Sequence, residues 1–149
     1  MSDLKIQEMT TDEICGAIAL WKRCEGIGLS DADEREPLTR FLLRNPGLCF
    51  TAYLDGKLVG TCLCGSDGRR GYLYHLAVDP ETRRMGIGRM LVNRVFDALQ
   101  KQDIHKCHIM VFANNELGLK FWKETGWTLR TEIAIMSYNV TTPKTSSPC

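Results

Sequence analysis

The sequence has no hydrophobic run long enough to cross a membrane. A transmembrane helix needs about 20 consecutive apolar residues, and the apolar runs of this 149-residue chain are much shorter. The first five residues, Met-Ser-Asp-Leu-Lys, lack the basic and apolar regions of a secretion signal. We therefore expect a cytoplasmic protein that has no membrane partner.

The sequence also lacks an excess of charge of either sign. Nineteen Lys and Arg residues are balanced by 18 Asp and Glu residues, which leaves a formal net charge of +1. Proteins that bind nucleic acid or an anionic membrane through electrostatics carry a marked positive excess. The composition therefore favours neither partner.

The seven cysteines lack the spacing of a metal or redox motif. Cys62 and Cys64 are separated by one residue, whereas zinc knuckles and thioredoxin-type pairs have two. His105 and His108 flank Cys107 without a carboxylate cluster, so we predict no metal site. An odd, scattered set of cysteines is typical of reduced thiols, most of them small apolar core residues.

Hydrophobic spacing predicts alternating helices and strands. Apolar residues recur at helical spacing in four segments, at about residues 11–25, 37–45, 87–101 and 115–125. Strand-like segments lie at residues 4–9, 48–54, 57–64, 70–78, 105–111, 127–130 and 133–138. Local signals support these bounds: Thr10 with Glu13 forms a capping-box pattern, and Asp55-Gly56 between two apolar runs predicts a hairpin.

This order of elements predicts one α/β domain over residues 1–140. Its sheet is expected to be mixed, mostly antiparallel and seven-stranded, with helices on both faces. The unit over residues 73–111 runs strand, helix, strand, and such a right-handed crossover makes its two strands parallel. Residues 141–149, rich in Ser, Thr and Pro, are typical of a disordered tail.

The loop that follows the strand at residues 70–78 has the features of an anion site. A helix start leaves backbone N–H groups unpaired and carries a partial positive charge. Gly86 and Gly88 have no Cβ, so an anion can approach the backbone closely. Arg83 and Arg84 add charged donors.

The motif Arg83-x-x-Gly86-x-Gly88 after Leu76-Ala77-Val78 resembles the pyrophosphate loop of the GNAT superfamily of N-acetyltransferases, and the order of elements agrees over about residues 3–139. The resemblance implies an acyl-CoA N-acyltransferase fold in which two parallel strands splay apart and acetyl-CoA binds between them. It implies that the backbone of Leu76, Ala77 and Val78 holds the pantetheine arm. It assigns the pyrophosphate to Arg83, Arg84, Met85, Gly86, Ile87, Gly88 and Arg89.

A second motif, Asn115-x-x-Gly118-x-x-Phe121-Trp122, is similar to the family's Asn-x-x-Ala-x-x-Phe-Tyr pattern. The resemblance implies that these residues bind the cofactor, with Phe121 beside its adenine–pantetheine side. Trp122 replaces the tyrosine that protonates the leaving thiolate, and an indole N–H is not an acid. Because a coenzyme A thiol has a pKa of about 8.5, its thiolate leaves with little help. We interpret Trp122 as a weak hydrogen-bond donor that shapes the acyl pocket.

Acetyl transfer to an amine requires a neutral amine and a donor for the developing oxyanion. The resemblance assigns the donor to the N–H of Val78, but the base stays open. Tyr72 stands where several family members have a carboxylate, Tyr74 is a second candidate for a water-mediated relay, and Glu25 ends the first helix. Loss of the proton directly to water is a further alternative.

Strict strand alternation would place Tyr72, Tyr74 and Leu76 on one face and Leu73, His75 and Ala77 on the other. On that register His75 competes as a base only if a bulge reverses the faces.

The predicted function is transfer of acetyl from acetyl-CoA to a primary amine of a small molecule or protein, by direct attack in a ternary complex. A catalytically silent acetyl-CoA sensor is the alternative. A nucleotide site is disfavoured, because the loop has neither a third glycine nor a Lys-Ser/Thr pair. The acidic run at residues 31–36, which borders the acceptor site in the family, would attract a cation. A homodimer is the default assembly.

Overall fold

The computed structural model describes residues 3–144 and 148–149 and contains one five-stranded sheet of order β1-β2-β3-β4-β5. Strands β1 to β4 pair antiparallel, and β5 pairs parallel to β4. Their bounds are β1 (Leu4–Glu8), β2 (Phe50–Leu54), β3 (Lys57–Ser66), β4 (Gly71–Val78) and β5 (Cys107–Ile109).

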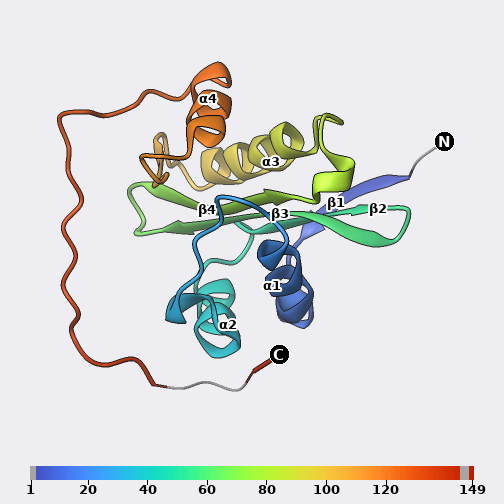
Figure 1. Ribbon diagram of the computed structural model, residues 1–149, viewed down its shortest axis with the longest axis horizontal. Coiled ribbons are helices and arrows are strands. Elements are labelled where there is room, and N and C mark those ends of the chain that lie inside the picture. Colours follow the sequence, from blue (N-terminus) through green and yellow to red (C-terminus); the bar gives the residue numbers. More distant parts are fainter. Residues whose placement is uncertain (1–2, 145–147) are drawn as a thin grey trace.

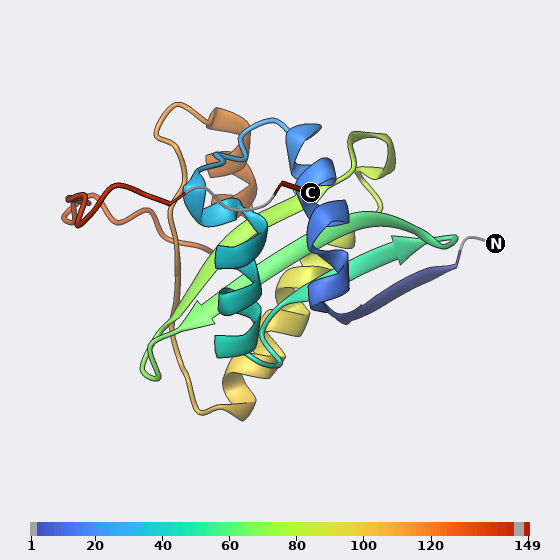
Figure 2. The ribbon, with the colours of Figure 1, turned by 90° about the horizontal axis from the view of Figure 1, so that it is seen from below.

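Helices cover both faces of the sheet (Figure 1). One face carries α1 (Ile14–Lys22) and α2 (Arg35–Arg44), and the other carries α3 (Ile87–Lys101) and α4 (Glu116–Glu124), as Figure 2 also shows. Each face has its own core: Leu91 and Val95 of α3 pack on one side, and Trp21 of α1 on the other. No helix in the described part of the chain is long and apolar enough to cross a membrane.

Three short 3-10 turns complete the fold: η1 (Thr11–Glu13), η2 (Asp31–Asp33) and η3 (Pro80–Thr82). The predicted capping box is confirmed, because the Thr10 N–H donates to the Glu13 carboxylate at 2.8 Å. The predicted hairpin is also confirmed. Asp55 and Gly56 have positive φ values of 51° and 82°, as a type I′ turn requires.

A β-bulge interrupts the pairing of β3 with β4. Thr61 pairs with Ala77 and Leu63 with Tyr74, so two residues of β4 lie opposite one residue of β3. His75, the first of these two, has a φ of 47°. A bulge inserts one extra residue and shifts the alternation of side chains.

The alternation predicted for β4 is therefore wrong beyond Tyr74. Leu76 packs in the α3-side core together with Leu73, whereas Tyr74 and Ala77 pack on the α1–α2 side. His75 contacts Trp21 of α1 and so lies on the same side as Tyr74.

The parallel pair of β4 and β5 is short. Pairing covers only Gly71–Leu73 of β4 against Cys107–Ile109 of β5. Among the described residues, the part of β4 from residue 74 to 78 has no strand partner on the β5 side. Pairing between the two strands therefore ends at Leu73 and Ile109, where β5 itself ends.

The sheet has five strands and not the seven predicted. Residues 127–130 and 133–138 form no ladder and run as an extended segment around the outside of the domain (Figure 1). Most of their side chains are exposed, up to 94% for Met136, whereas Trp127 is partly buried against Phe96 and Trp122. Strand propensity is realised only against a neighbouring strand and a buried face. β5 is three residues long, shorter than the predicted 105–111, and offers too little edge.

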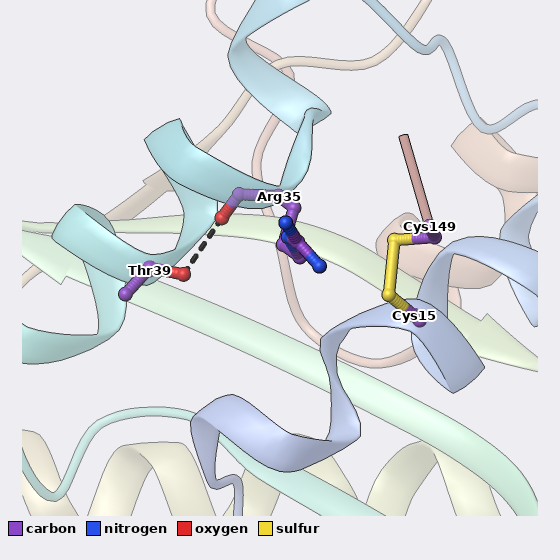
Figure 3. Close-up of a disulfide and its surroundings, with 4 residues drawn as sticks. All are labelled: Cys15, Arg35, Thr39 and Cys149. Carbon is purple, nitrogen blue, oxygen red and sulfur yellow. Dashed lines mark hydrogen bonds between the residues drawn. A yellow bond between two sulfur atoms is a disulfide. The ribbon is translucent and has the colours of Figure 1, made fainter. Parts of the chain in front are cut away.

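A disulfide joins Cys15 of α1 to Cys149, close to α2 (Figure 3). The expectation that all seven cysteines are reduced is therefore wrong for this pair, which is 134 residues apart in sequence and has no local signature. The other five cysteines are free. Four of them are buried, as expected for small core residues (Cys24, Cys49, Cys62 and Cys64), and Cys107 is partly buried. Residues 145–147 of the predicted tail lie outside the described residues.

Asp79 ties the end of β4 to the loop before α3 and is 1% exposed. Its Oδ1 accepts the Glu81 N–H at 3.0 Å, and its Oδ2 lies 3.1 Å from Arg23 Nη1 and 3.7 Å from Lys57 Nζ. The Glu81 hydrogen bond lowers the pKa of Asp79 against the opposing effect of burial, and the two cations lower it further.

We expect Asp79→Asn to lower the free energy of unfolding by about 1–3 kcal/mol at neutral pH. The folded-state pKa lies below the unfolded-state value, so the stabilisation is complete above the unfolded-state pKa and is lost as pH falls through the folded-state pKa. Urea unfolding from neutral to acidic pH should show the difference from wild type shrinking toward acid. Asp97→Asn, an exposed carboxylate of α3, is the control. A pH-independent difference would contradict this account.

Candidate functional site

The start of α3 presents unpaired backbone N–H groups. Gly86 is the N-cap residue with a φ of 79°, which glycine adopts without steric cost. The first helical hydrogen bond runs from Met90 N–H to Gly86 O at 3.1 Å. The N–H groups of Ile87, Gly88 and Arg89 therefore have no acceptor within the helix, which makes this end a donor site for an anion.

Gly88 lies where three elements meet. A Cβ built on it would be 3.7 Å from side-chain atoms of Leu76 in β4 and Phe121 in α4, and 3.8 Å from Val78. A longer side chain would fill this space. Next to Gly86, by contrast, there is nothing within 4 Å. The structure thus brings together four predicted cofactor residues around an open helix start, which we call the Gly88 cradle (Leu76, Val78, Gly88 and Phe121).

The arginines of the loop have different surroundings. Arg83 donates from Nε to the Val78 carbonyl at 3.3 Å and so braces the end of β4. Arg84 is exposed and has a φ of 69°. Arg89 and Phe121 help to line a cavity of about 80 Å³ between α3 and α4. Arg84 and Arg89 are exposed cations next in sequence to the start of α3, and Met85 between them is half-exposed.

The backbone of Val78 faces the open side of β4. The Asp79 N–H donates to the Val59 carbonyl at 2.7 Å, so these two residues form a hydrogen-bonded pair of the antiparallel ladder. The adjacent residue, Val78, then belongs to a non-bonded pair and directs its N–H and C=O away from β3. Its carbonyl accordingly accepts from the Cys24 thiol at 3.6 Å. The N–H of Val78 is placed to donate to a group in the gap between β4 and β5.

The bulge directs His75 toward the segment between α1 and α2. His75 Nε2 lies 2.6 Å from Asp33 Oδ1, and the imidazole lies 4.5 Å from the Trp21 ring between centroids. Both side chains of the pair are 13% exposed. Burial alone would raise the pKa of Asp33, but the hydrogen bond and charge of His75, together with hydrogen bonds from Ser30, lower it. The result is a largely buried imidazole–carboxylate pair.

The predicted bases are placed less favourably. Tyr72 stacks on His108 with 5.8 Å between ring centroids, and Tyr74 packs edge-on against Phe41 at 5.9 Å. Burial raises the pKa of Tyr74, with smaller contributions from Tyr72 and Cys64, so its phenol stays protonated. Glu25 is exposed beyond the end of α1, which stops at Lys22 and not at the predicted residue 25.

The second motif forms the start and the buried face of α4. Asn115 Oδ1 accepts the Gly118 N–H at 2.9 Å and caps the helix. Trp122 is 8% exposed and packs edge-on against Phe121 and Trp127, each at 5.0 Å between centroids. Asn115 and Trp122 thus have structural roles of their own, whereas Phe121 reaches the Gly88 cradle.

Sequence reasoning missed the partner of His75. Asp33 belongs to the acidic run at residues 31–36, whose pattern is that of a solvated helix start. Its contact with His75 spans 42 residues of sequence. A signal existed in the capping pattern of Ser30 with Asp33, which predicts an ordered turn but not what the turn touches.

Comparison with known proteins places this geometry in a family. The model of the acetyltransferase (GNAT) family matches residues 13–127. An acetyltransferase of Pectobacterium atrosepticum is 32% identical over 121 residues, which cover 81% of this chain and 85% of the relative. The chain therefore belongs to the GNAT acetyltransferase family.

Solved structures share the fold. The PaiA N-acetyltransferase of Thermoplasma acidophilum in complex with coenzyme A superposes with a TM-score of 0.77 at 19% identity, covering 86% of this chain and 91% of that one. The aminoglycoside N-acetyltransferase AAC(6')-Iy in complex with CoA gives a TM-score of 0.74 at 18% identity, covering 95% and 97%. At these identities the likeness establishes the acyltransferase fold.

Asn115→Ala is expected to destabilise the protein by about 1 kcal/mol, because it removes the N-cap acceptor of α4. Thermal unfolding without ligand measures this effect separately from any contribution of Asn115 to cofactor binding. Asn114→Ala, one residue earlier and exposed, is the matched control and should unfold like wild type. Equal melting temperatures for all three proteins would show that the cap contributes nothing.

Proposed function

We propose that the protein transfers the acetyl group of acetyl-CoA to a primary amine by direct attack within a ternary complex. The observation that carries the proposal is the Gly88 cradle, where the start of α3, with its unpaired N–H groups, meets side chains of β4 and α4. Family membership and fold neighbours crystallised with coenzyme A support this choice of cosubstrate.

The residues present fit coenzyme A. The unpaired N–H groups from Ile87 to Arg89 supply donors for the pyrophosphate, and Arg84 and Arg89 add positive charge. The pantetheine arm would lie along the open edge of β4, against the backbone of Leu76 to Val78. Any side chain beyond a methyl at Gly88 would occupy the same space.

Val78 supplies the electrostatic part of the reaction. Its N–H, directed to the open side of β4, donates to the carbonyl oxygen of the thioester as negative charge develops there. Acetyl-CoA itself brings an activated carbonyl and a thiolate leaving group. The protein must help the acceptor amine to lose a proton, because an alkylamine with a pKa of about 10 is charged at neutral pH.

The acceptor is a primary amine of a small molecule or of a protein. One fold neighbour is described as an aminoglycoside acetyltransferase. The acidic stretch from Asp31 to Glu36 favours a cationic acceptor on the α1–α2 side of the sheet. The alternative function is a silent acetyl-CoA sensor, which the replacement of the motif tyrosine by Trp122 favours. Release of thiol in the presence of any amine excludes the sensor.

Arg84→Ala and Arg89→Ala should each weaken acetyl-CoA binding by about 10- to 100-fold, the equivalent of one charge-assisted hydrogen bond. Calorimetry measures the dissociation constants, and thermal unfolding with acetyl-CoA, ATP or NAD tests ligand choice. Acetyl-CoA at about 100 times its dissociation constant adds roughly 2.7 kcal/mol of stability. Arg44→Ala, an exposed arginine on α2, is the control. Absence of any shift with acetyl-CoA would overturn the proposed function.

Trp122→Phe should change turnover by less than about tenfold, whereas loss of a general acid costs about 10²–10⁴. The reason is that an indole N–H cannot protonate a thiolate and Trp122 is already packed in the core. Steady-state kinetics at saturating amine, with melting temperature as a folding check, measure the effect. Trp127→Phe in the same aromatic cluster is the matched control. A selective loss above a hundredfold in Trp122→Phe would assign this residue a chemical role.

A further inference from the structure

His75 is held in a strained backbone conformation by buried hydrogen bonds. A left-handed φ is unfavourable at a residue other than glycine and persists only where the surroundings enforce it. Here the Thr61 hydroxyl donates to the His75 carbonyl at 2.9 Å, and the Trp21 indole N–H donates to that hydroxyl at 2.8 Å. Trp21 and Thr61 are 1% and 0% exposed. The bulge is therefore a fixed feature that aims the imidazole at the α1–α2 segment.

Asp33 is equally well fixed. Its Oδ2 accepts the Ser30 N–H at 2.9 Å within the capped turn η2, and its Oδ1 contacts His75 Nε2. An ionised carboxylate only accepts, so His75 must donate from Nε2, and the lone pair of the neutral ring is then on Nδ1. Nδ1 has no hydrogen-bond partner among the residues that the structure describes. The pair thus presents a proton acceptor of defined tautomer.

We propose that His75 is the base that removes the proton from the acceptor amine and that Asp33 is its positioning residue. This inference rests on the proposed acetyl transfer and identifies the side chain that performs its proton transfer. The amine nitrogen forms a bond to the acetyl carbon, and its proton passes to His75 Nδ1. The C–S bond breaks and its electron pair leaves on sulfur. The imidazolium, stabilised by Asp33, then returns the proton to the thiolate or to water.

The other titratable groups around His75 are less suited to this role. Burial raises the pKa of the Tyr74 phenol on the same strand and of the Cys24 thiol at the end of α1, so both are neutral at pH 7. The α1–α2 segment carries the carboxylates of Glu25, Asp31, Asp33 and Glu34, and that of Asp33 is hydrogen-bonded to the ring. Imidazole is also the side chain whose proton exchange falls closest to neutral pH.

The test measures kcat/KM against pH for wild type, His75→Gln, Asp33→Asn and the control Asp97→Asn, an exposed carboxylate of α3. The amine is whichever of spermidine, neamine or an N-terminal alanine peptide the wild type acetylates. His75→Gln should lose about 10²–10⁴ in kcat/KM at pH 7. The wild type should also lose activity toward acid more steeply than His75→Gln, because the imidazole must be neutral to act.

Asp33→Asn separates positioning from folding, since it leaves the bulge and the core intact. It should lose less activity than His75→Gln, and the loss should fall on kcat and not on KM, because the imidazole is still present but is no longer held by the carboxylate. Asp97→Asn should behave like wild type. An unchanged activity and pH profile in either His75→Gln or Asp33→Asn would overturn the proposal.

Acetyl-CoA binding distinguishes this proposal from the proposed function on which it rests. His75→Gln and Asp33→Asn should both keep the wild-type thermal shift with acetyl-CoA, because neither residue belongs to the Gly88 cradle. If wild type and His75→Gln acetylate an amine equally well, only the assignment of His75 as the base is refuted. If wild type neither binds acetyl-CoA nor acetylates any of the three amines, the proposed function is refuted, and the assignment of His75 as the base falls with it.

Discussion

The site depends on the way β4 departs from regular pairing on both of its edges. Toward β3 the ladder contains a bulge at His75, and toward β5 the pairing stops at Leu73. The first irregularity aims a side chain, and the second exposes the backbone of the strand up to Val78. A regular strand would have satisfied its N–H groups on both sides and left no donor for a ligand. The energetic cost of the bulge is offset by the buried bonds of Thr61 and Trp21.

The sheet also separates two kinds of charge. The start of α3, with Arg84 and Arg89, lies on one face and suits an anion, whereas Asp33 and its acidic neighbours lie on the α1–α2 face and suit a cation. Under the proposed function, an anionic cosubstrate and a cationic acceptor would approach from these opposite faces and meet at Val78, the arrangement that direct transfer requires.

Most of the fold could be predicted because its signals are local. A capping pair three residues apart at Thr10, a two-residue turn at Asp55 and a glycine-opened helix at Gly86 each act within a few residues of sequence. The loop at residues 83–89 is defined by a local pattern of the same kind, and its assignment to the cofactor stays a prediction. The final two strands were not, since Ile133 and Ile135 have strand propensity but no edge to pair with.

The unpredicted part of the site depends on contacts between distant residues. The bulge at His75 is held by Trp21 and Thr61, which are 40 residues apart, and Asp33 is 42 residues from its imidazole. Side-chain alternation along β4 carries no trace of these bonds and predicted the wrong face for His75. Such departures from local rules are expected where a fold positions reactive groups.

The Asp33–His75 pair bears directly on the missing tyrosine of the second motif. In a mechanism with separate base and acid, replacing that tyrosine by Trp122 would remove the acid. An imidazole that takes the amine proton becomes an imidazolium, which is itself an acid. It can protonate the leaving thiolate, whose conjugate thiol has a pKa of about 8.5. One histidine could then serve both transfers in sequence, and Trp122 would be free to pack in the core as the structure shows. On this view the substitution at Trp122 and the bulge at His75 are parts of one arrangement.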